Sequence, residues 1–123
     1  MAEELFNKYT KKHSAISAGT SVEKEWFGKA LSLFPNHVIE AMKEEYLDLS
    51  KNKPKQLTQK MTEEVERIIV LAQKDHCPDY LLKSKKTIFW DVPDPRGQDL
   101  EFHRKVRDLI KIKVKDLINK ISF

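Results

Sequence analysis

Two side chains stand in local contexts that favour acid or nucleophilic chemistry. Asp94 lies between two prolines in the segment Pro93-Asp94-Pro95. Proline restricts the backbone, and a carboxylate is a side chain that can act as a general acid. Cys77 is the single cysteine and follows His76, which suggests a Cys–His nucleophile, although sequence neighbours usually point in different directions. On the residues alone, structural roles are the favoured interpretation: a turn for Asp94 and packing for Cys77.

A metal site has weaker support. The segment from Asp75 to Asp79 groups two carboxylates with His76 and Cys77, but no second Cys/His pair follows at a zinc-like spacing. The remaining histidines are dispersed, and we expect them on the surface or at helix ends: His13, His37 and His103. We therefore predict no metal and no cofactor.

Two arginines flank the Asp-Pro loop, and both could attract an anion. They are Arg96 and Arg104. Nearby carboxylates at Asp99 and Glu101 offer them partners, so solvated or paired arginines are the favoured interpretation.

Size and composition predict one globular domain over residues 1–123. The chain is 40% hydrophobic and 34% charged, which excludes a disordered or fibrous class. No apolar run approaches the ~18–20 residues that span a bilayer, and the first residues lack the pattern of a secretory signal. A single cysteine excludes an internal disulfide and favours a reducing compartment, so we expect a cytoplasmic protein without a membrane partner.

Positive charge is concentrated at the end of the chain. Residues 103–123 hold seven Lys or Arg against two Asp, a net +5, while the whole chain has +4. A basic helix can bind nucleic acid or an acidic partner. No aromatic residues interleave with these charges, so a solvated helix face is favoured and nucleic acid is unlikely.

Hydrophobic periodicity predicts helices alternating with buried strands. We expect helices over residues 2–12, after Pro35, from Thr58 to about Val65, and from Gln98 or Asp99 towards Ile121. We expect strands over residues 14–17, 67–71 and 87–90. The run 67–71 is continuously apolar, which is typical of a strand buried on both faces. The fold class is therefore α/β, with an open, mostly parallel sheet and helices on both faces.

Helical spacing also predicts which side chains are buried. The helix after Pro35 has apolar or aromatic residues at helical spacing, namely Val38, Ile39, Met42 and Tyr46. The last helix would bury a stripe formed by Phe102, Val106, Leu109, Ile110, Leu117 and Ile121.

Several segments, in this order, carry a resemblance to a known family. They are Met1-Ala2-Glu3-Glu4-Leu5-Phe6, Ile16-Ser17-Ala18-Gly19-Thr20, Lys55-Gln56-Leu57-Thr58 and Pro93-Asp94-Pro95-Arg96-Gly97 before the terminal helix. The chain resembles the low-molecular-weight protein tyrosine phosphatases and their relatives, the thioredoxin-coupled arsenate reductases, over essentially all 123 residues. Cys77-Pro78, followed by a Trp before the Asp-Pro loop, is closer to the arsenate reductase branch.

The resemblance implies a segment that this sequence lacks. In the family, the first strand leads into a phosphate-binding loop with a Cys, five residues and an Arg, and the Met-Ala-Glu helix follows. The loop's N–H groups hold a phosphate or arsenate dianion and lower the pKa of the thiol. We therefore expect an N-terminally incomplete domain that is catalytically inactive as written. With the loop, it would hydrolyse phosphate monoesters or reduce arsenate through a Cys thiolate.

The resemblance also assigns residue roles. Asp94 matches the family's general acid. Cys77 matches a possible redox thiol of the arsenate reductase branch. In that branch, a thioredoxin-type reductant completes a disulfide relay. The chain has one thiol, and Ala72 lies where another would be expected. Ser17 and Thr20 would lie near the phosphate loop of an intact member, and here we interpret them as structural.

A missing central strand would leave a gap in the sheet. Neighbouring strands lie ~4.8 Å apart, so the loss separates two strands by nearly 10 Å. We predict that residues 14–17 pair with residues 67–71, or that a second chain fills the gap and forms a homo-oligomer through the exposed sheet edge. A non-catalytic pseudoenzyme that binds or dimerises is therefore the alternative to an enzyme.

Overall fold

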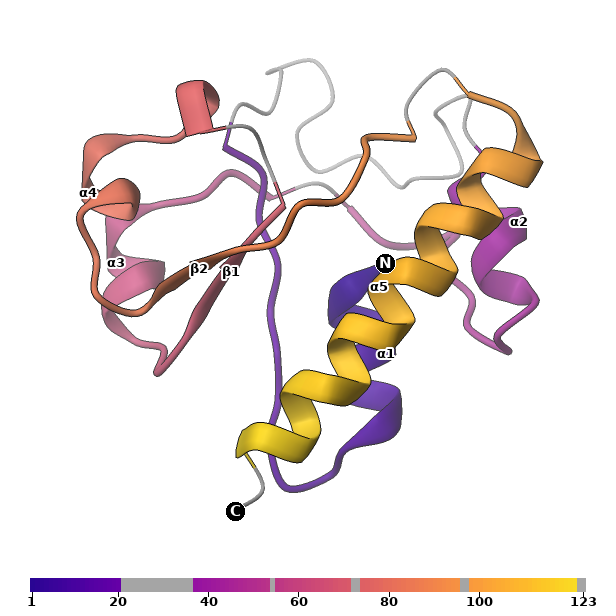
Figure 1. Cartoon of the computed structure of the whole chain (residues 1–123), viewed down its shortest axis with the longest axis horizontal. Helices are drawn as coiled ribbons and strands as arrows, with labels where there is room; N and C mark the ends of the chain where they lie inside the picture. The colour runs from indigo at the N-terminus through magenta and orange to yellow at the C-terminus, as the bar shows by residue number, and fades with distance from the viewer. Residues whose placement is uncertain (21–36, 54, 72–73, 96–97, 122–123) are drawn as a thin grey trace. The chain divides into compact units, whose positions relative to one another are not determined.

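The computed structural model describes residues 1–20, 37–53, 55–71, 74–95 and 98–121. These residues fall in two compact units, which are described separately (Figure 1). The first unit spans residues 1–17, 30–52 and 92–123, and the second spans residues 18–29 and 53–91. The expected apolar segment 21–35 lies outside the described residues.

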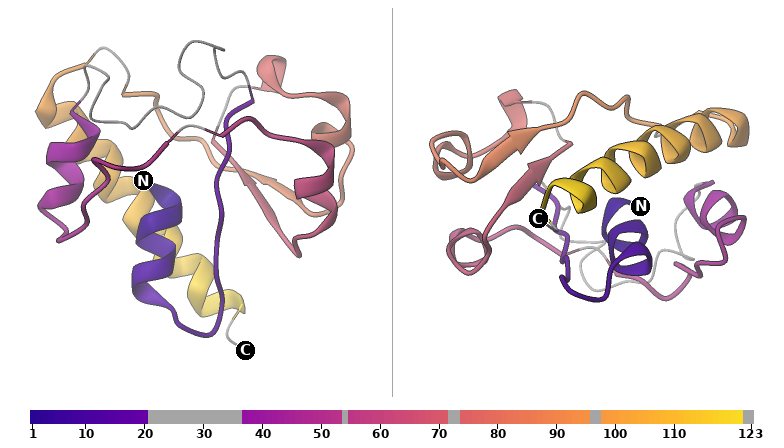
Figure 2. Two further views of the ribbon diagram at one scale, coloured as in Figure 1. Left: turned by 180° about the vertical axis from the view of Figure 1, so that it is seen from behind. Right: turned by 60° about the horizontal axis from the view of Figure 1, so that its bottom comes forward.

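The first unit is helical. Helix α1 (Ala2–Tyr9) and helix α2 (Val38–Lys43) each pack against the long helix α5 (Leu100–Ile121), as both views of Figure 2 show for α1. Their shared core consists of Leu5, Phe6, Ala41, Met42, Leu49, Val106, Ile110 and Val114. In the described part of the chain, no helix is long and apolar enough to cross a membrane.

Helix α5 begins where the sequence predicts. The Asp99 carboxylate accepts a hydrogen bond from the N–H of Phe102 at 2.9 Å, which satisfies an otherwise unpaired donor of the first turn. Val106 and Ile110 are buried as expected, and the other four predicted stripe residues are half-buried. The same face also buries Val114, His103 and Arg107, which the apolar pattern missed.

Helix α1 ends at Tyr9, three residues earlier than predicted. Thr10 is extended, with φ −138° and ψ 142°, and its N–H donates to the carbonyl of Phe6 at 3.2 Å. The Thr10 side chain then accepts from the N–H of Lys12 at 3.3 Å. This local bond competes with a further helical turn.

Helix α2 ends in a Schellman motif centred on Tyr46. The N–H of Leu47 donates to the carbonyl of Met42 at 3.1 Å, and the N–H of Tyr46 to that of Lys43 at 2.9 Å. This motif requires a left-handed residue, and Tyr46 accordingly has φ 62°. The expectation that Tyr46 continues the helix is therefore wrong: it lies beyond the end of α2, and its side chain is 93% exposed.

We predict that Tyr46→Gly raises the free energy of unfolding by about 1 kcal/mol. Glycine adopts the left-handed region without the clash that a side chain causes, and this gain exceeds its greater unfolded-state entropy. Urea denaturation followed by circular dichroism measures the change. Tyr46→Ala is the control and should give no comparable gain, since Ala keeps the Cβ. An unchanged or lower stability for the glycine variant would contradict the prediction.

The second unit contains a parallel strand pair. Strands β1 (Ile68–Val70) and β2 (Thr87–Phe89) pair in the register Ile68↔Thr87, Ile69↔Ile88 and Val70↔Phe89. Parallel strands need a crossover connection, which here includes the 3₁₀ helix η3 (Lys74–His76) and helix α4 (Asp79–Leu82). The predicted α/β class with a parallel sheet is confirmed.

Helix α3 (Gln59–Glu63) precedes β1 and begins as predicted. The Thr58 hydroxyl accepts from the N–H of Met61 at 3.4 Å, as an N-cap residue should. The helix then ends at Glu63, two residues before the expected Val65.

Residues 14–17 form no strand, so their predicted pairing with residues 67–71 is wrong. The Asn7 side chain satisfies the backbone of Ala15 instead: its amide donates to the Ala15 carbonyl at 3.1 Å, and its oxygen accepts from the Ala15 N–H at 2.8 Å. These bonds use the groups that a strand ladder needs. The parallel bridge forms later, between Gly19 and Gln56, where the Gly19 N–H donates to the carbonyl of Lys55 at 2.8 Å.

Strand β1 is less buried than its sequence suggests. Val70 is 5% exposed, but Ile68 and Ile69 are only half-buried, and Ile88 of β2 is 44% exposed. The sheet of the described residues has two strands, which are too few to enclose both faces. The prediction that residues 67–71 are buried on both faces is therefore not met in the described structure.

Candidate active site

The Asp-Pro loop is tied to the beginning of α5. The N–H of Gln98 donates to the carbonyl of Pro95 at 2.9 Å, which closes a turn directly before the helix. Asp94 is exposed, so its carboxyl group is accessible to a substrate. The two prolines and this turn restrict the backbone on either side of Asp94.

Two histidines pack at the beginning of this helix. His103 is 2% exposed, and its Nδ1 lies 2.8 Å from the carbonyl oxygen of Asp99. A carbonyl oxygen only accepts, so Nδ1 carries the proton in this bond. The His37 ring packs edge-on against His103, with 5.5 Å between ring centroids. The predicted surface position is therefore wrong for His103, because a packed ring pair and a backbone partner make its burial favourable.

The first turn of α1 is also fixed by side chains. Glu3 accepts from the Ser17 hydroxyl at 3.1 Å, and Glu4 accepts from the Asn52 amide at 2.7 Å. Carboxylates in a first turn interact favourably with the helix dipole. These bonds hold Ser17 and Asn52 beside the N-terminal end of α1, and they agree with a structural role for Ser17.

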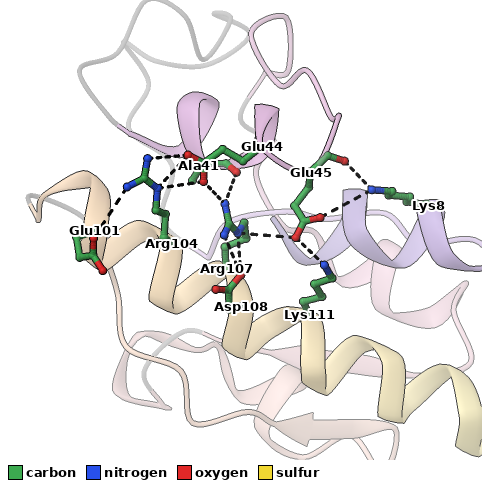
Figure 3. A network of polar contacts seen from close by, with 9 residues as sticks. All are labelled: Lys8, Ala41, Glu44, Glu45, Glu101, Arg104, Arg107, Asp108 and Lys111. Carbon is green, nitrogen blue, oxygen red and sulfur yellow. Dashed lines mark hydrogen bonds and ion pairs between the residues drawn. The ribbon is translucent and has the colours of Figure 1, made fainter.

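Glu44 binds two arginines of α5 (Figure 3). Arg104 donates from Nε to Oε1 at 3.0 Å and from Nη2 to Oε2 at 2.7 Å, a bidentate pair. The Nη1 of Arg107 donates to Glu44 at 2.5 Å and to the carbonyl of Ala41 at 2.8 Å. Arg104 thus has Glu44 as its main partner, and Glu101 lies farther away at 4.0 Å. Arg96 lies outside the described residues.

Glu45, the next residue, connects α2 with both other helices. Its carboxylate accepts from Lys111 at 2.8 Å, and its carbonyl accepts from Lys8 of α1 at 2.6 Å (Figure 3). Arg107 lies 3.9 Å from the same carboxylate. Two consecutive glutamates therefore join the three helices of the first unit.

We predict that Glu44 makes stability depend on acid pH. Hydrogen bonds from Arg104 and Arg107 lower the pKa of Glu44 from 4.5 to about 2. A depressed pKa contributes stability that is complete above pH 4.5 and is lost as pH falls towards 2. Urea denaturation of the wild type and Glu44→Gln should show a stability difference that shrinks over this range. Glu101→Gln is the control, and an equally large pH-dependent difference there would contradict the assignment to Glu44.

Cys77 lies in the second unit, between η3 and α4, whereas Asp94 belongs to the first unit. The thiol is half-buried, and burial together with the nearby Asp75 carboxylate raises its pKa. A thiolate is the reactive form of cysteine, so this environment disfavours nucleophilic attack at neutral pH. Five residues separate Cys77 from Lys83, the spacing at which a Cys-x5-Arg loop would have its arginine. These residues form α4, in which Leu81 is buried, so they are not a phosphate-binding loop. Ala72 lies outside the described residues.

Metal ligation finds no support at this position or elsewhere in the described residues. Among them, no group of three or more His, Cys, Asp or Glu side chains is placed to hold a metal ion.

Comparison with known proteins identifies the family. The model of the low molecular weight phosphotyrosine protein phosphatase family matches residues 1–122. The chain belongs to this phosphatase family. No curated protein matches the chain.

Solved structures of the phosphatase family and its relatives share the fold. Vibrio vulnificus Wzb, solved in complex with benzylphosphonate, has a TM-score of 0.79 and 25% identity and covers 97% of this chain and 87% of its own. A low molecular weight protein tyrosine phosphatase from T. tengcongensis has a TM-score of 0.74 and 26% identity, covering 97% and 88%. An arsenate reductase in the reduced state has a TM-score of 0.68 at 23% identity, covering 97% and 86%, and shows likeness of fold alone.

Proposed function

We propose that residues 1–123 are the body of a single cytoplasmic phosphatase domain that hydrolyses phosphate monoesters when a Cys-x5-Arg loop is supplied. The observation that carries this proposal is the exposed Asp94 on a proline-bounded loop fixed to the start of α5. The sequence as written contains no Cys-x5-Arg segment, so residues 1–123 alone are expected to be inactive. The lone cysteine agrees with a reducing compartment.

In the proposed reaction, Asp94 acts as the general acid. A thiolate in the supplied loop attacks phosphorus, and the bond from phosphorus to the leaving oxygen breaks. Asp94 donates its proton to that oxygen, so the product leaves as a neutral alcohol or phenol. Water then hydrolyses the thiophosphate, and Asp94 accepts its proton. Aryl phosphates are the favoured substrate class, since Wzb binds benzylphosphonate, an aromatic phosphate mimic.

Arsenate reduction has less support than phosphate-ester hydrolysis. A reduction relay through a thioredoxin-type partner needs resolving thiols in addition to the nucleophile. The chain offers Cys77 alone, and burial raises the pKa of that thiol. Cys77 as a redox thiol is therefore the less favoured variant of the proposal.

The second candidate is a non-catalytic module that dimerises. The observation in its favour is the incomplete burial of β1 and β2, in which Ile88 is 44% exposed. Unpaired strands bind further strands readily, and a second copy would cover this surface. Light scattering of the purified chain tests this candidate, because a monomer at high concentration would exclude it.

The decisive experiment compares residues 1–123 with a chimera. In the chimera, the first strand and Cys-x5-Arg loop of the T. tengcongensis phosphatase precede Ala2. We expect hydrolysis of p-nitrophenyl phosphate by the chimera and none by residues 1–123. A chimera with the loop Cys replaced by Ser is the matched control and should be inactive. A folded chimera without activity would overturn the enzymatic proposal, whereas thiol-dependent turnover by residues 1–123 would refute their inactivity.

A further inference from the structure

The structure places three lysines around one aromatic ring. The ammonium groups of Lys8, Lys111 and Lys115 lie 5.4, 5.9 and 4.8 Å from the ring centroid of Tyr9. Each distance is within the range of a cation–π interaction. Aromatic residues do not alternate with the lysines of α5 in sequence, but the fold brings Tyr9 of α1 between them.

This cluster has an excess of positive charge. Glu45 pairs with Lys111 at 2.8 Å and lies 3.9 Å from Lys8. Lys115 is exposed and pairs with no carboxylate among the described residues. Three cations therefore surround one ring, and only Lys8 and Lys111 share the anion Glu45. An acidic ligand would complement the remaining charge.

Tyr46 extends the cluster at a cost in backbone energy. The Lys8 ammonium lies 5.7 Å from the Tyr46 ring centroid, so Lys8 stands within reach of both rings. Tyr46 is 93% exposed and left-handed at φ 62°, a position that glycine fills with less strain. Strained residues that persist on a surface are candidates for function, and exposed tyrosines are frequent anchors of interfaces.

We propose that Tyr9, Tyr46, Lys8, Lys111 and Lys115 form a docking surface for an acidic peptide segment of a partner protein. The lysines bind the carboxylates, and the exposed Tyr46 ring contacts the aliphatic part of the segment. Cations cover the half-buried Tyr9 ring, which leaves little free aromatic face for stacked bases. An acidic peptide is therefore favoured over single-stranded nucleic acid.

The test uses the whole chain and a fluorescein-labelled peptide of Glu residues interrupted by Leu, with binding followed by anisotropy. We expect Lys115→Gln to raise Kd by roughly two- to fivefold. Lys105→Gln removes the same charge from an exposed position on α5 and should leave Kd nearly unchanged. Binding that weakens equally in both variants would reduce the interaction to general charge attraction and overturn the proposal.

Tyr46→Gly provides the second test. This variant should raise the stability of the chain and yet weaken peptide binding by roughly two- to fivefold, the range for loss of a modest surface contact. A purely structural Tyr46 would not combine these opposite effects. Unchanged affinity for this variant, no binding at low salt, or tighter binding of an oligothymidylate than of the acidic peptide would each overturn the proposal.

Discussion

Replacing Asp94 by asparagine lowers kcat for p-nitrophenyl phosphate by about 100- to 10,000-fold in the phosphate-loop chimera, the contribution typical of general acid–base catalysis. Asn has nearly the same size as Asp, but it cannot donate a proton to the leaving oxygen. Asp94 is exposed, so we expect little change in stability and an effect on the chemical step. Steady-state kinetics with separate kcat and KM values measure it.

The leaving group identifies the role of Asp94. A phenolate with a low pKa leaves without protonation, so 2,4-dinitrophenyl phosphate should lose far less rate than phenyl phosphate in the Asp94→Asn chimera. Asp99→Asn is the matched control, because Asn also caps helices and the α5 start should persist. Equal losses for both substrates would show that Asp94 does not act as the acid.

Arg107→Met is expected to lower the free energy of unfolding by about 1–3 kcal/mol, the cost of leaving a buried hydrogen-bond partner unsatisfied. Arg107 is 9% exposed and donates to the Ala41 carbonyl and the Glu44 carboxylate. Met keeps an unbranched apolar chain, so packing is largely retained. The loss therefore reports the unpaired carbonyl and carboxylates. Urea denaturation monitored by circular dichroism measures it.

Arg104→Met is the control for this prediction. Arg104 also binds Glu44, but its side chain is 41% exposed, so water replaces the lost bonds. Its loss of stability should be clearly smaller than that of Arg107→Met. If the two substitutions had equal effects, burial of Arg107 would not explain its contribution.

Local signals predicted the element boundaries that depend on neighbouring residues. Thr58 and Asp99 cap α3 and α5 because a short oxygen-bearing side chain reaches the N–H three residues ahead. The apolar runs 67–71 and 87–90 predicted where β1 and β2 lie, but their pairing with each other was not predicted. These features need only nearby sequence, and the sequence was sufficient for them.

Buried polar residues were missed because their partners are distant in sequence. The sequence pattern gave no sign that Arg107 and His103 are buried. Arg107 donates to the Ala41 carbonyl, and the His103 ring packs against His37; both partners lie more than sixty residues away in sequence. Residues 14–17 failed as a strand for a related reason, since Asn7 satisfies Ala15 first. At the candidate site, Asp94 was singled out through the family resemblance of its loop, whereas the packed rings of His37 and His103 could be found only from the tertiary structure.

The packing of α1 against α5 also bears on how the chain folds. These helices occupy the first and last parts of the sequence, and α2 contributes from between them. Contacts between distant segments require closure of a long loop, which slows folding. During synthesis, Leu5 and Phe6 therefore emerge from the ribosome long before α5 exists to cover them. The helical unit can form only after α5 has been translated, and chaperones have time to bind the exposed helix α1 before that point.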